Sequence, residues 1–451
     1  MITGNSQRLF ETRRLDSQAR LAELVALARD RSPYYRDLYR DVGPDVQNVT
    51  ELPVTDKQQL MHRFDDWCTD RAVTRDRVEA WVADRGRVGD RFLGRYLVAT
   101  TSGTSGRRGL FVQDDSALRV NRDLSVRMMT KWVTLRDLPG LLRGGGRMAM
   151  VAATGGHFMV ASGVARMQQS NPLVKKMIKV FSVHTPLGQL VTQLNAFRPA
   201  VLAGYGTLMS LLAGEQKAGR LRIRPMLIEP AGETLSPLQR QRIEGAFGAK
   251  IRDVYGSTEC TFLTSGCAYG AYHLNEDWVI VEPVEVDHSP TPRGQLSHTV
   301  LITNLANRVQ PVLRYDLGDR VRSLVDPCPC GNPATALQVT GRASAALRFP
   351  CSGGGVEIPA LTFGTLLDHT PGVELAQIVQ VGEVELSVRL RVAPGLDRAL
   401  VWDRLREDLD QLLARFDLAH VRLRLFDDEP QQEPGGKFRT VISMDGLERV
   451  A

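Results

Sequence analysis

The sequence reads Thr100-Thr101-Ser102-Gly103-Thr104-Ser105-Gly106-Arg107-Arg108-Gly109 directly after Tyr96-Leu97-Val98-Ala99, a short run that predicts a strand end. Glycines let the backbone approach an anion closely, and exposed N–H groups together with hydroxyls can surround phosphate oxygens. The spacing fits neither the Walker loop, which needs Lys and then Ser or Thr after its last glycine, nor the dinucleotide-binding fingerprint. Taken alone, the stretch fits a Ser/Gly-rich surface loop equally well, so its meaning depends on the residues downstream.

The size and composition of the chain exclude several classes of partner. Its 451 residues, 43% hydrophobic and 24% charged, are typical of a globular protein of two or three domains. The net charge of +6 is small, and no dense Lys/Arg run carries interleaved aromatics, so we expect no nucleic-acid partner. Residues 1–14 lack a signal-peptide core, and the glycine-containing uncharged run at 148–165 fits a buried strand and loop better than a membrane span. We therefore expect no membrane partner. Six cysteines without a regular framework favour a reduced, cytoplasmic protein.

The hydrophobic pattern predicts an α/β fold with a smaller α+β part at the C-terminus. Short apolar runs at 148–152, 200–203, 226–228, 251–255 and 300–303 alternate with helical patterns. Beyond a glycine cluster at 352–355 the pattern changes. Strict alternation over 384–392 predicts a half-buried strand, and the spacing of apolar residues over 401–416 predicts one face of a helix. The domain boundary is therefore placed near 343–345.

Four further segments follow the opening loop in a fixed order. They are Ala231-Gly232-Glu233-Thr234, Tyr255-Gly256-Ser257-Thr258-Glu259, Arg314-Tyr315-Asp316-Leu317-Gly318-Asp319 and Gly435-Gly436-Lys437-Phe438-Arg439. Glycines at strand ends let backbone face a purine, a Thr hydroxyl can bond a phosphate oxygen, and Glu supplies the hard oxygen ligands that Mg²⁺ prefers. A carboxylate can bridge two ribose hydroxyls, and a mobile lysine can neutralise charge at a reacting phosphate. Lysine is also scarce here, with only eight in the chain, so Lys437 stands out.

Each of these residues has an ordinary structural alternative. Asp319 fits a turn carboxylate, Glu259 fits an acid at a helix start, and Lys437 fits the tip of a hairpin after a Pro-Gly-Gly turn. Singly, each alternative is as good as the functional interpretation. The occurrence of all five segments in one order favours a nucleotide site.

Taken together, the five segments resemble the adenylate-forming superfamily, and within it most closely the phenylacetate–CoA ligase family. Further support comes from Pro33-Tyr34-Tyr35-Arg36, Leu52-Pro53-Val54-Thr55-Asp56-Lys57, Cys328-Pro329-Cys330-Gly331 and Gly341-Arg342. The resemblance covers nearly the whole chain. It implies a large multi-layer N-terminal adenylation domain at 1–343 and a small, mobile α+β lid domain at 344–451 that carries Lys437.

The resemblance also implies roles for individual residues. The phosphate loop would be Thr101, Ser102, Gly103, Thr104, Ser105 and Gly106, and the adenine site would comprise Ala231, Gly232, Glu233 and Tyr255 with Gly256 and Ser257. Thr258 would touch the α-phosphate, Glu259 would bind Mg²⁺, and Lys437 would be the adenylation lysine. Asp319 would hold the ribose, with Arg342 near the ribose or phosphate. His157 and Tyr205 are candidate walls of the acid pocket, although a packed structural histidine is as good an interpretation of His157.

The implied reaction is ATP- and Mg²⁺-dependent activation of a carboxylic acid as acyl-AMP, with pyrophosphate released, followed by transfer to CoA as a thioester. The favoured acid is aromatic or aryl-alkanoic. A carrier-protein thiol or an amine is the alternative acceptor, and a nucleotide-binding module without turnover is the alternative outside enzymes; the resemblance also admits a homodimer. The chain departs from the family at Arg107-Arg108, in place of a lysine, and at the hinge, where Ala343-Ser344-Ala345 replaces an acidic pair.

A structural zinc site is the last expectation. Cys328 and Cys330 form one half of a chelate, and Cys267 with His273 forms the other half. Three thiolates and one imidazole make a closed tetrahedral zinc set, and family members with these spacings resemble zinc proteins. Cys260 is a rival for Cys267, and buried thiols beside a core histidine are the alternative without metal.

Overall fold

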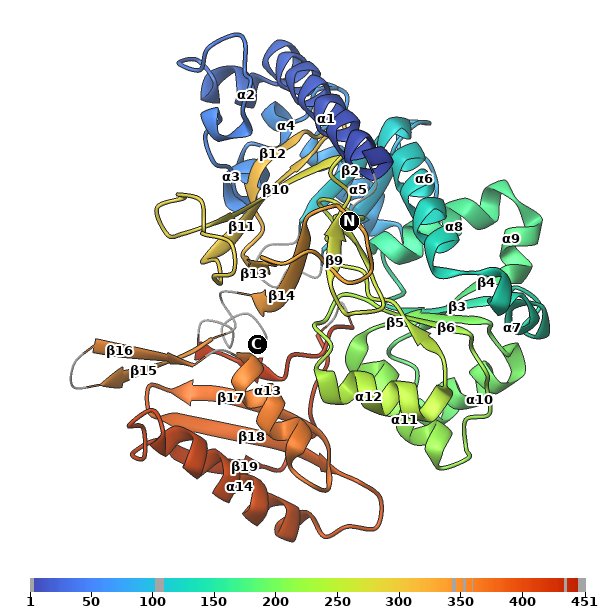
Figure 1. The fold of residues 1–451 in the computed structure, drawn as a ribbon, viewed down its shortest axis with the longest axis vertical. Coiled ribbons are helices and arrows are strands. Elements are labelled where there is room, and N and C mark those ends of the chain that lie inside the picture. Colours follow the sequence, from blue (N-terminus) through green and yellow to red (C-terminus); the bar gives the residue numbers. More distant parts are fainter. Residues whose placement is uncertain are drawn as a thin grey trace.

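The computed structural model describes residues 4–101, 109–342, 346–351, 354–358, 360–433 and 436–444. Ser102, Gly103, Thr104, Ser105 and Gly106 of the predicted phosphate loop lie outside these ranges, as do Ala343 and Ser344 of the predicted hinge. Within them the chain forms helices packed on several sheets (Figure 1), which confirms the predicted α/β class.

One long helix, several short helices and a β-hairpin form the N-terminal part. The Oγ of Ser32 accepts a hydrogen bond from the Tyr35 backbone N–H and so caps α2, and Pro33 takes the first helical position, where no N–H is needed. The Tyr35 hydroxyl and the Trp67 indole N–H donate to the Pro311 carbonyl at 2.8 and 2.7 Å, which holds these helices against the start of β12. The elements are α1 (Gly4–Arg31), α2 (Pro33–Leu38), η1 (Val49–Glu51), α3 (Lys57–His62), α4 (Phe64–Trp67), α5 (Arg75–Ala83), η2 (Arg85–Arg87), β1 (Leu97–Thr100) and β2 (Leu110–Gln113).

A five-stranded parallel sheet of order β4-β3-β5-β6-β7 follows. Its strands are continuous apolar runs because α10, α11 and α12 cover one face and α6 covers the other. The strand order reverses between β3 and β5, and open sheets of this kind bind ligands beyond the carboxyl ends of the strands at such a point. The elements are α6 (Asp115–Trp132), η3 (Leu135–Asp137), α7 (Leu138–Arg143), β3 (Met148–Ala152), α8 (Met159–Ser170), α9 (Pro172–Met177), β4 (Ile178–Ser182), α10 (Leu187–Phe197), β5 (Val201–Gly204), α11 (Gly206–Lys217), β6 (Leu227–Pro230), α12 (Pro237–Phe247) and β7 (Lys250–Ile251).

Two antiparallel sheets, β10-β11-β12 and β13-β14-β9-β8, come next in the chain. Their apolar residues join the core of the N-terminal helices, so the first and third quarters of the sequence fold together. The strands are β8 (Thr264–Gly266), β9 (Tyr272–Leu274), β10 (Val279–Val284), β11 (Thr299–Asn304), β12 (Val312–Asp316), β13 (Asp319–Ser323) and β14 (Ala336–Arg342).

The C-terminal part has a hydrophobic core of its own. Leu386, Val388 and Leu390 of β18 are buried at alternate positions, as the pattern predicts, and α14 buries Leu405 and Leu409 against them. The elements are β15 (Leu347–Cys351), β16 (Gly354–Ile358), α13 (Ala360–His369), β17 (Val373–Gly382), β18 (Glu385–Val392), α14 (Arg398–Ala414), β19 (Arg422–Phe426) and β20 (Val441–Ile442). The sheet has the order β19-β18-β17-β20. The domain boundary at 343/344 stays a prediction.

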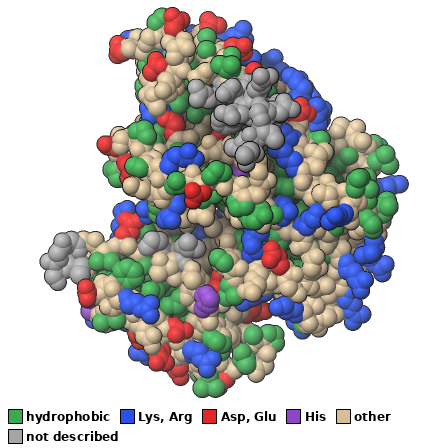
Figure 2. Space-filling view, viewed as in Figure 1, with side chains coloured by type: hydrophobic (Ala, Val, Ile, Leu, Met, Phe, Trp, Pro, Cys, Tyr) green, Lys and Arg blue, Asp and Glu red, His purple; other side chains and the backbone are tan. Residues whose placement is uncertain are grey.

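The C-terminal part contacts the rest of the molecule through α12 and α13. Ser236 caps α12, and its hydroxyl donates to Asp368 of α13 at 2.6 Å, while the Gln239 amide donates to the same carboxylate at 3.4 Å. Figure 2 shows the surface hollowed where the two parts meet. Among the residues described here, no helix combines the length and the apolar character that crossing a membrane requires.

Candidate active site

One cavity of about 1140 Å³ opens at the carboxyl ends of β3, β5 and β6 and is bordered by the C-terminal part. It gathers predicted site residues that lie far apart in the sequence. Those that line it are Thr101, Tyr205, Ala231, Gly232, Glu233, Tyr255, Gly256, Ser257, Thr258, Glu259, Asp319 and Lys437. A large cavity at the switch point of a parallel sheet, with several polar groups converging on it, is the usual form of a ligand site.

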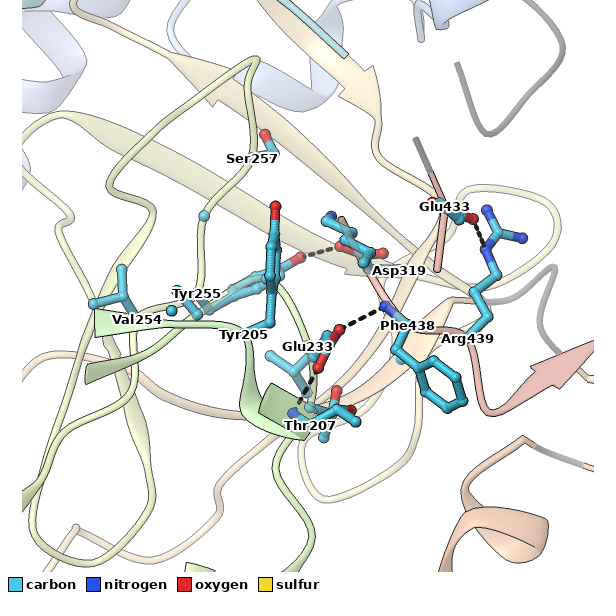
Figure 3. A pocket seen from close by; sticks show the side chains of 18 of the residues that line it. Tyr205, Thr207, Glu233, Val254, Tyr255, Ser257, Asp319, Glu433, Phe438 and Arg439 are labelled. Atoms are coloured by element: carbon cyan, nitrogen blue, oxygen red, sulfur yellow. Dashed lines mark hydrogen bonds and ion pairs between the residues drawn. The ribbon is translucent and has the colours of Figure 1, made fainter. Parts of the chain in front are cut away.

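Tyr255 and Asp319 lie side by side in the wall of this cavity (Figure 3). The Tyr255 hydroxyl donates to Oδ2 of Asp319 at 2.9 Å, and the Tyr255 ring packs edge-on against Tyr272 with centroids 6.1 Å apart. Asp319 begins β13 and pairs with Arg342 of β14, whose side chain lies outside the described structure. The predicted ribose carboxylate and the predicted adenine-stacking ring are therefore neighbours.

The turn after β6 brings Lys437 and Tyr205 together. Gly232 has a φ of +76°, and a Cβ at this position would lie 3.1 Å from the Tyr205 ring and 3.5 Å from Cε of Lys437. Gly436 also has a positive φ, of +77°, and a Cβ there would overlap Val183 and approach the Tyr205 ring. Glycine is required at both turns so that the two segments can approach closely.

Glu233 joins the lysine segment to the central sheet. Its carboxylate accepts hydrogen bonds from the backbone N–H groups of Thr207, at 2.8 Å, and Phe438, at 2.7 Å (Figure 3). Burial raises the pKa of Glu233, although these hydrogen bonds and the charge of Lys437 oppose the shift. Beside it, Arg439 forms an ion pair with Glu433. Glu233 therefore holds Lys437 at the cavity.

Glu259 is fixed by two contacts from the neighbouring sheet. The Tyr315 hydroxyl donates to Oε1 at 3.1 Å, and the Asn304 amide donates to the Glu259 backbone carbonyl at 2.9 Å. The turn that precedes it is tight, because a Cβ on Gly256 would overlap the Thr261 carbonyl. This places a positioned carboxylate beside Thr258 in the cavity wall.

The two ends of the predicted phosphate loop are pinned together beside the cavity. Thr101 donates its N–H to the Gly109 carbonyl at 3.0 Å, and its Oγ1 accepts from the Gly109 N–H at 2.9 Å. Lys57, at the start of α3, donates to the same Oγ1 at 3.2 Å and also lines the cavity. The sequence did not identify Lys57 as a site residue, although Asp56-Lys57 at a capped helix start, in a chain poor in lysine, was a usable signal.

His157 does not line the cavity. It is 1% exposed, and its Nε2 lies 3.1 Å from the Asp84 carbonyl, which favours the packed-histidine interpretation. Its backbone carbonyl accepts from the Thr100 N–H at 2.7 Å and so supports the start of the predicted phosphate loop. The acid pocket role proposed for this residue has no support in the geometry, whereas Tyr205 lies in the wall.

The four predicted metal ligands form one cluster. The ligand atoms of Cys267, His273, Cys328 and Cys330 all lie within 4.8 Å of one another. Sγ of Cys267 is 3.7 Å from Sγ of Cys328, and Sγ of Cys330 is 3.1 Å from Nε2 of His273. Two thiolates about 2.3 Å from a tetrahedral zinc lie about 3.8 Å apart, so the sulfur spacing fits that ion.

The surroundings of the cluster suit a metal as well. Nδ1 of His273 lies 3.1 Å from the Ala334 carbonyl, which orients the ring and directs Nε2 at the thiols. Burial opposes ionisation of Cys267, but hydrogen bonds from His273 and neighbouring backbone N–H groups outweigh it and lower its pKa. Cys260 lies outside the cluster, and burial raises its pKa to about 12. The structure thus favours Cys267 over Cys260.

Glu229 is a cavity residue that the sequence analysis missed. It lies within β6, and its side chain lines the cavity. Burial raises the pKa of Glu229 to about 7. No hydrogen bond or ion pair to its carboxylate occurs among the described residues. A glutamate inside a predicted apolar strand was the available signal.

The raised pKa predicts a pH-dependent stability. Between the ordinary glutamate pKa near 4.3 and the folded value near 7, the unfolded chain releases this proton first, so the stability of the fold falls as pH rises through this window. Glu229→Gln should therefore stabilise the protein above pH 7 by up to about 3 kcal/mol, and much less at pH 4.5. Denaturant unfolding at several pH values measures this, with the exposed Glu407→Gln as control. Equal effects of Glu229→Gln at all pH values would show that Glu229 is not the group that titrates.

Comparisons with known proteins support the same assignment of the fold. No protein-family model matches the chain. Phenylacetate-coenzyme A ligase of Thermus thermophilus is 23% identical over 334 residues, 70% of this chain and 66% of that protein. Protein CapK of Staphylococcus aureus is 28% identical over 156 residues, 34% of this chain and 33% of that protein. The chain thus matches about two thirds of the length of one curated relative and a third of the other.

Solved structures match over a larger share of the chain. A 2-hydroxyisobutyryl-CoA ligase in the postadenylation state has a TM-score of 0.67 at 20% identity, covering 96% of this chain and 90% of that one. The same enzyme in the thioesterification state has a TM-score of 0.55 over the same shares. A benzoate CoA ligase from Burkholderia xenovorans has a TM-score of 0.51 at 17% identity, covering 76% of this chain and 67% of that one. The chain is therefore homologous to phenylacetate-coenzyme A ligase and has the fold of the CoA ligases of the adenylate-forming superfamily.

Proposed function

We propose that the chain is an ATP-dependent acid–CoA ligase that forms an acyl-adenylate and then a thioester. The observation that carries this proposal is the single cavity in which Glu259, Asp319 and Lys437 meet, because these residues come from three distant segments. An acid at a helix start, a turn carboxylate and a hairpin lysine with no shared function would have no reason to converge.

The proposed first step is attack of the acid carboxylate on the α-phosphate of ATP, with pyrophosphate as the leaving group. Tyr255 and the turn at Ala231–Gly232 would enclose the adenine, and Asp319 would accept hydrogen bonds from the ribose hydroxyls. Negative charge develops on the α-phosphate as the new bond forms, and Lys437 would offset it. Thr258 would hold an α-phosphate oxygen.

Two further groups would manage the charge of the triphosphate. Glu259 is the proposed Mg²⁺ ligand, and the Tyr315 hydrogen bond already holds its carboxylate in one orientation. A bound Mg²⁺ would supply a positive charge that stabilises the departing pyrophosphate. Lys57 would add a second positive charge at the Thr101 end of the phosphate loop.

CoA is the proposed acceptor in the second step, and an aromatic acid is the proposed substrate. A solved relative of the same fold binds 2-HIB-AMP and CoA, and other relatives are named for phenylacetate and benzoate. We also propose that the Cys/His cluster holds one structural zinc, which would join the segment after Glu259 to the loop between β13 and β14. A reduced cytoplasmic location and a homodimer stay predictions.

Pyrophosphate release tests the first step and product mass tests the second. Purified protein with ATP, Mg²⁺ and a panel of aryl acids should release pyrophosphate only when an acid is present. Adding CoA should give a product with the mass of the thioester. If an added amine gives an amide and CoA gives no thioester, the acceptor is a nitrogen nucleophile and not CoA. No pyrophosphate with any acid would contradict the proposed function.

A further inference from the structure

Glu229 lies on one identifiable face of the central sheet. Leu227, two residues before it and therefore on the same face, packs against Trp132 of α6. In the sheet register Glu229 pairs with Ala203 of β5, which pairs with Met150 of β3. The Glu229 side chain is thus on the face that α6 covers. It lies two residues closer to the carboxyl end of β6 than the packed Leu227, and there it lines the cavity.

The walls around this position are apolar. Met150 and Ala203 occupy the same row of the sheet and line the cavity. Val254 and Phe262 pack against the cluster that contains Leu227, and they line the cavity too. The corner of the cavity that holds Glu229 therefore has one carboxylate and otherwise mainly hydrophobic walls.

The carboxylates assigned to the nucleotide and Mg²⁺ are engaged by the protein itself, whereas Glu374 of β17, which also lines the cavity, has the charges of Arg391 and Arg220 nearby. Glu233 accepts two backbone N–H groups, Glu259 accepts the Tyr315 hydroxyl, and Asp319 accepts the Tyr255 hydroxyl. For Glu229, no donor or cation contacts the carboxylate among the described residues. Three basic side chains of the cavity are engaged elsewhere: Lys57 with Thr101, Arg242 with Ser210, and Arg439 with Glu433. The fourth, Lys437, acts on Glu233.

Glu229 is half-buried, and its side chain lines the cavity without a partner among the described residues. A ligand that fills this corner would remove the carboxylate from water, and a cation carried by the ligand would offset that cost. We infer that Glu229 receives a protonated amine carried by the acid substrate, so that the substrate class is a carboxylic acid with an aliphatic amino group. This inference rests on the proposed function, because it identifies the acid of that reaction. Glu229 would be a specificity residue in the wall of the acid pocket.

The spacing along β6 limits the size of this acid. Gly232, where an added Cβ would lie 3.5 Å from Cε of Lys437, follows Glu229 by three residues, so the two backbones lie at most about 10 Å apart. The amine and the reacting carboxylate of the acid would therefore be separated by a span of this order, which favours a compact acid. A small amino acid or an aminomethyl-substituted aromatic acid satisfies the limit.

Matched acids that differ in one group test the inference. One series is 4-(aminomethyl)benzoate, 4-(hydroxymethyl)benzoate and 4-methylbenzoate, and a second pair is phenylalanine and 3-phenylpropanoate. The aliphatic amines are protonated at pH 7. Pyrophosphate release is measured for wild type, Glu229→Leu, Glu229→Gln and the exposed control Glu407→Gln, with kcat and KM separated.

In at least one series, wild type and Glu407→Gln should favour the amine over the methyl or unsubstituted acid by roughly 100-fold or more in kcat/KM. Glu229→Leu should reverse this order and gain activity with the apolar acid. Glu229→Gln should raise kcat/KM for 4-(hydroxymethyl)benzoate relative to kcat/KM for 4-(aminomethyl)benzoate. A wild type that prefers the apolar acid in both series, or a preference that Glu229→Leu leaves unchanged, would overturn the inference while leaving the proposed ligase function intact.

Binding measured without turnover separates the two proposals. At pH 6 Glu229 is mostly protonated, so an ammonium that binds beside it should displace up to one proton into the buffer. Calorimetry in buffers of different ionisation enthalpy should detect this proton for wild type and not for Glu229→Gln. Amine binding with proton release but no pyrophosphate would refute the ligase function and support the site. Absence of both amine preference and proton release would refute the site.

Discussion

Replacing Lys437 with alanine is expected to slow adenylation by roughly 100- to 1,000-fold, in the range found when one preorganised donor is removed from a reaction centre. The lysine segment is seated by the Glu233–Phe438 hydrogen bond and by the packing of Gly436 against Val183, and neither depends on the lysine side chain. The variant should therefore fold normally and keep the cavity. Pyrophosphate release under saturating ATP and acid measures the loss.

The second half-reaction supplies the internal control for this variant. When chemically prepared acyl-adenylate and CoA are supplied, Lys437→Ala should form the thioester at close to the wild-type rate, because no charge on the α-phosphate then needs to be offset during bond formation. Lys217→Ala, an exposed lysine at the end of α11, should leave both half-reactions unchanged. If Lys437→Ala retained normal pyrophosphate release, the proposed mechanism would be wrong.

The convergence of the site could be predicted because its residues follow strand ends. Ala231–Glu233 follow β6, and the segment at 255–259 follows β7. Carboxyl ends of parallel strands share one edge of the sheet, so their turns must meet there. The position of Lys437 was predictable only from the resemblance, since no local pattern specifies that a C-terminal loop returns across more than 200 residues to contact Glu233.

Glu229 was missed because an apolar run predicts a buried strand, but it does not show which face of the sheet a side chain is on or what surrounds it. Its neighbours in sequence are apolar, and only the register with Ala203 and Met150 shows that it reaches the cavity. A related difference concerns the strand predicted at 251–255: β7 covers only Lys250–Ile251, and Val254 adds a single further bridge to Ala231. After Val254 the chain leaves the sheet to form the tight turn in which Gly256 passes the Thr261 carbonyl.

The cysteine spacing predicted the metal cluster better than it predicted any single ligand. A Cys-x-Cys pair and a Cys-x5-His pair each place two donors close together, but which cysteine completes the set depends on the path of the chain. The hairpin of β8 and β9 puts Cys267 and His273 at one end, and β14 pairs with β9 and brings Cys328 and Cys330 to them. Cys260 precedes this hairpin and stays in the core.

Purified protein is expected to contain one zinc per chain, and removing it should lower the melting temperature by several degrees. An ion whose free concentration is about 100 times its dissociation constant stabilises the fold by about 2.7 kcal/mol. Structural zinc commonly binds more tightly than this. Cys328→Ser should reproduce the loss in both zinc content and melting temperature. Elemental analysis and thermal unfolding, with and without a chelator, measure these quantities.

The choice of control decides between a metal site and a group of packed thiols. Cys260→Ala removes a buried thiol outside the cluster, so it should lower stability through a cavity but keep one zinc per chain. In Cys328→Ser, by contrast, a chelator should have little further effect on the melting temperature, because the site is already open. Because the cluster joins the segment that follows Glu259 to the loop after β13, loss of zinc should also weaken ATP binding, which a nucleotide titration of the chelated protein would detect. Protein that carries no stoichiometric zinc, and whose melting temperature is the same with and without chelator, would leave the four residues as a packed thiol and histidine core.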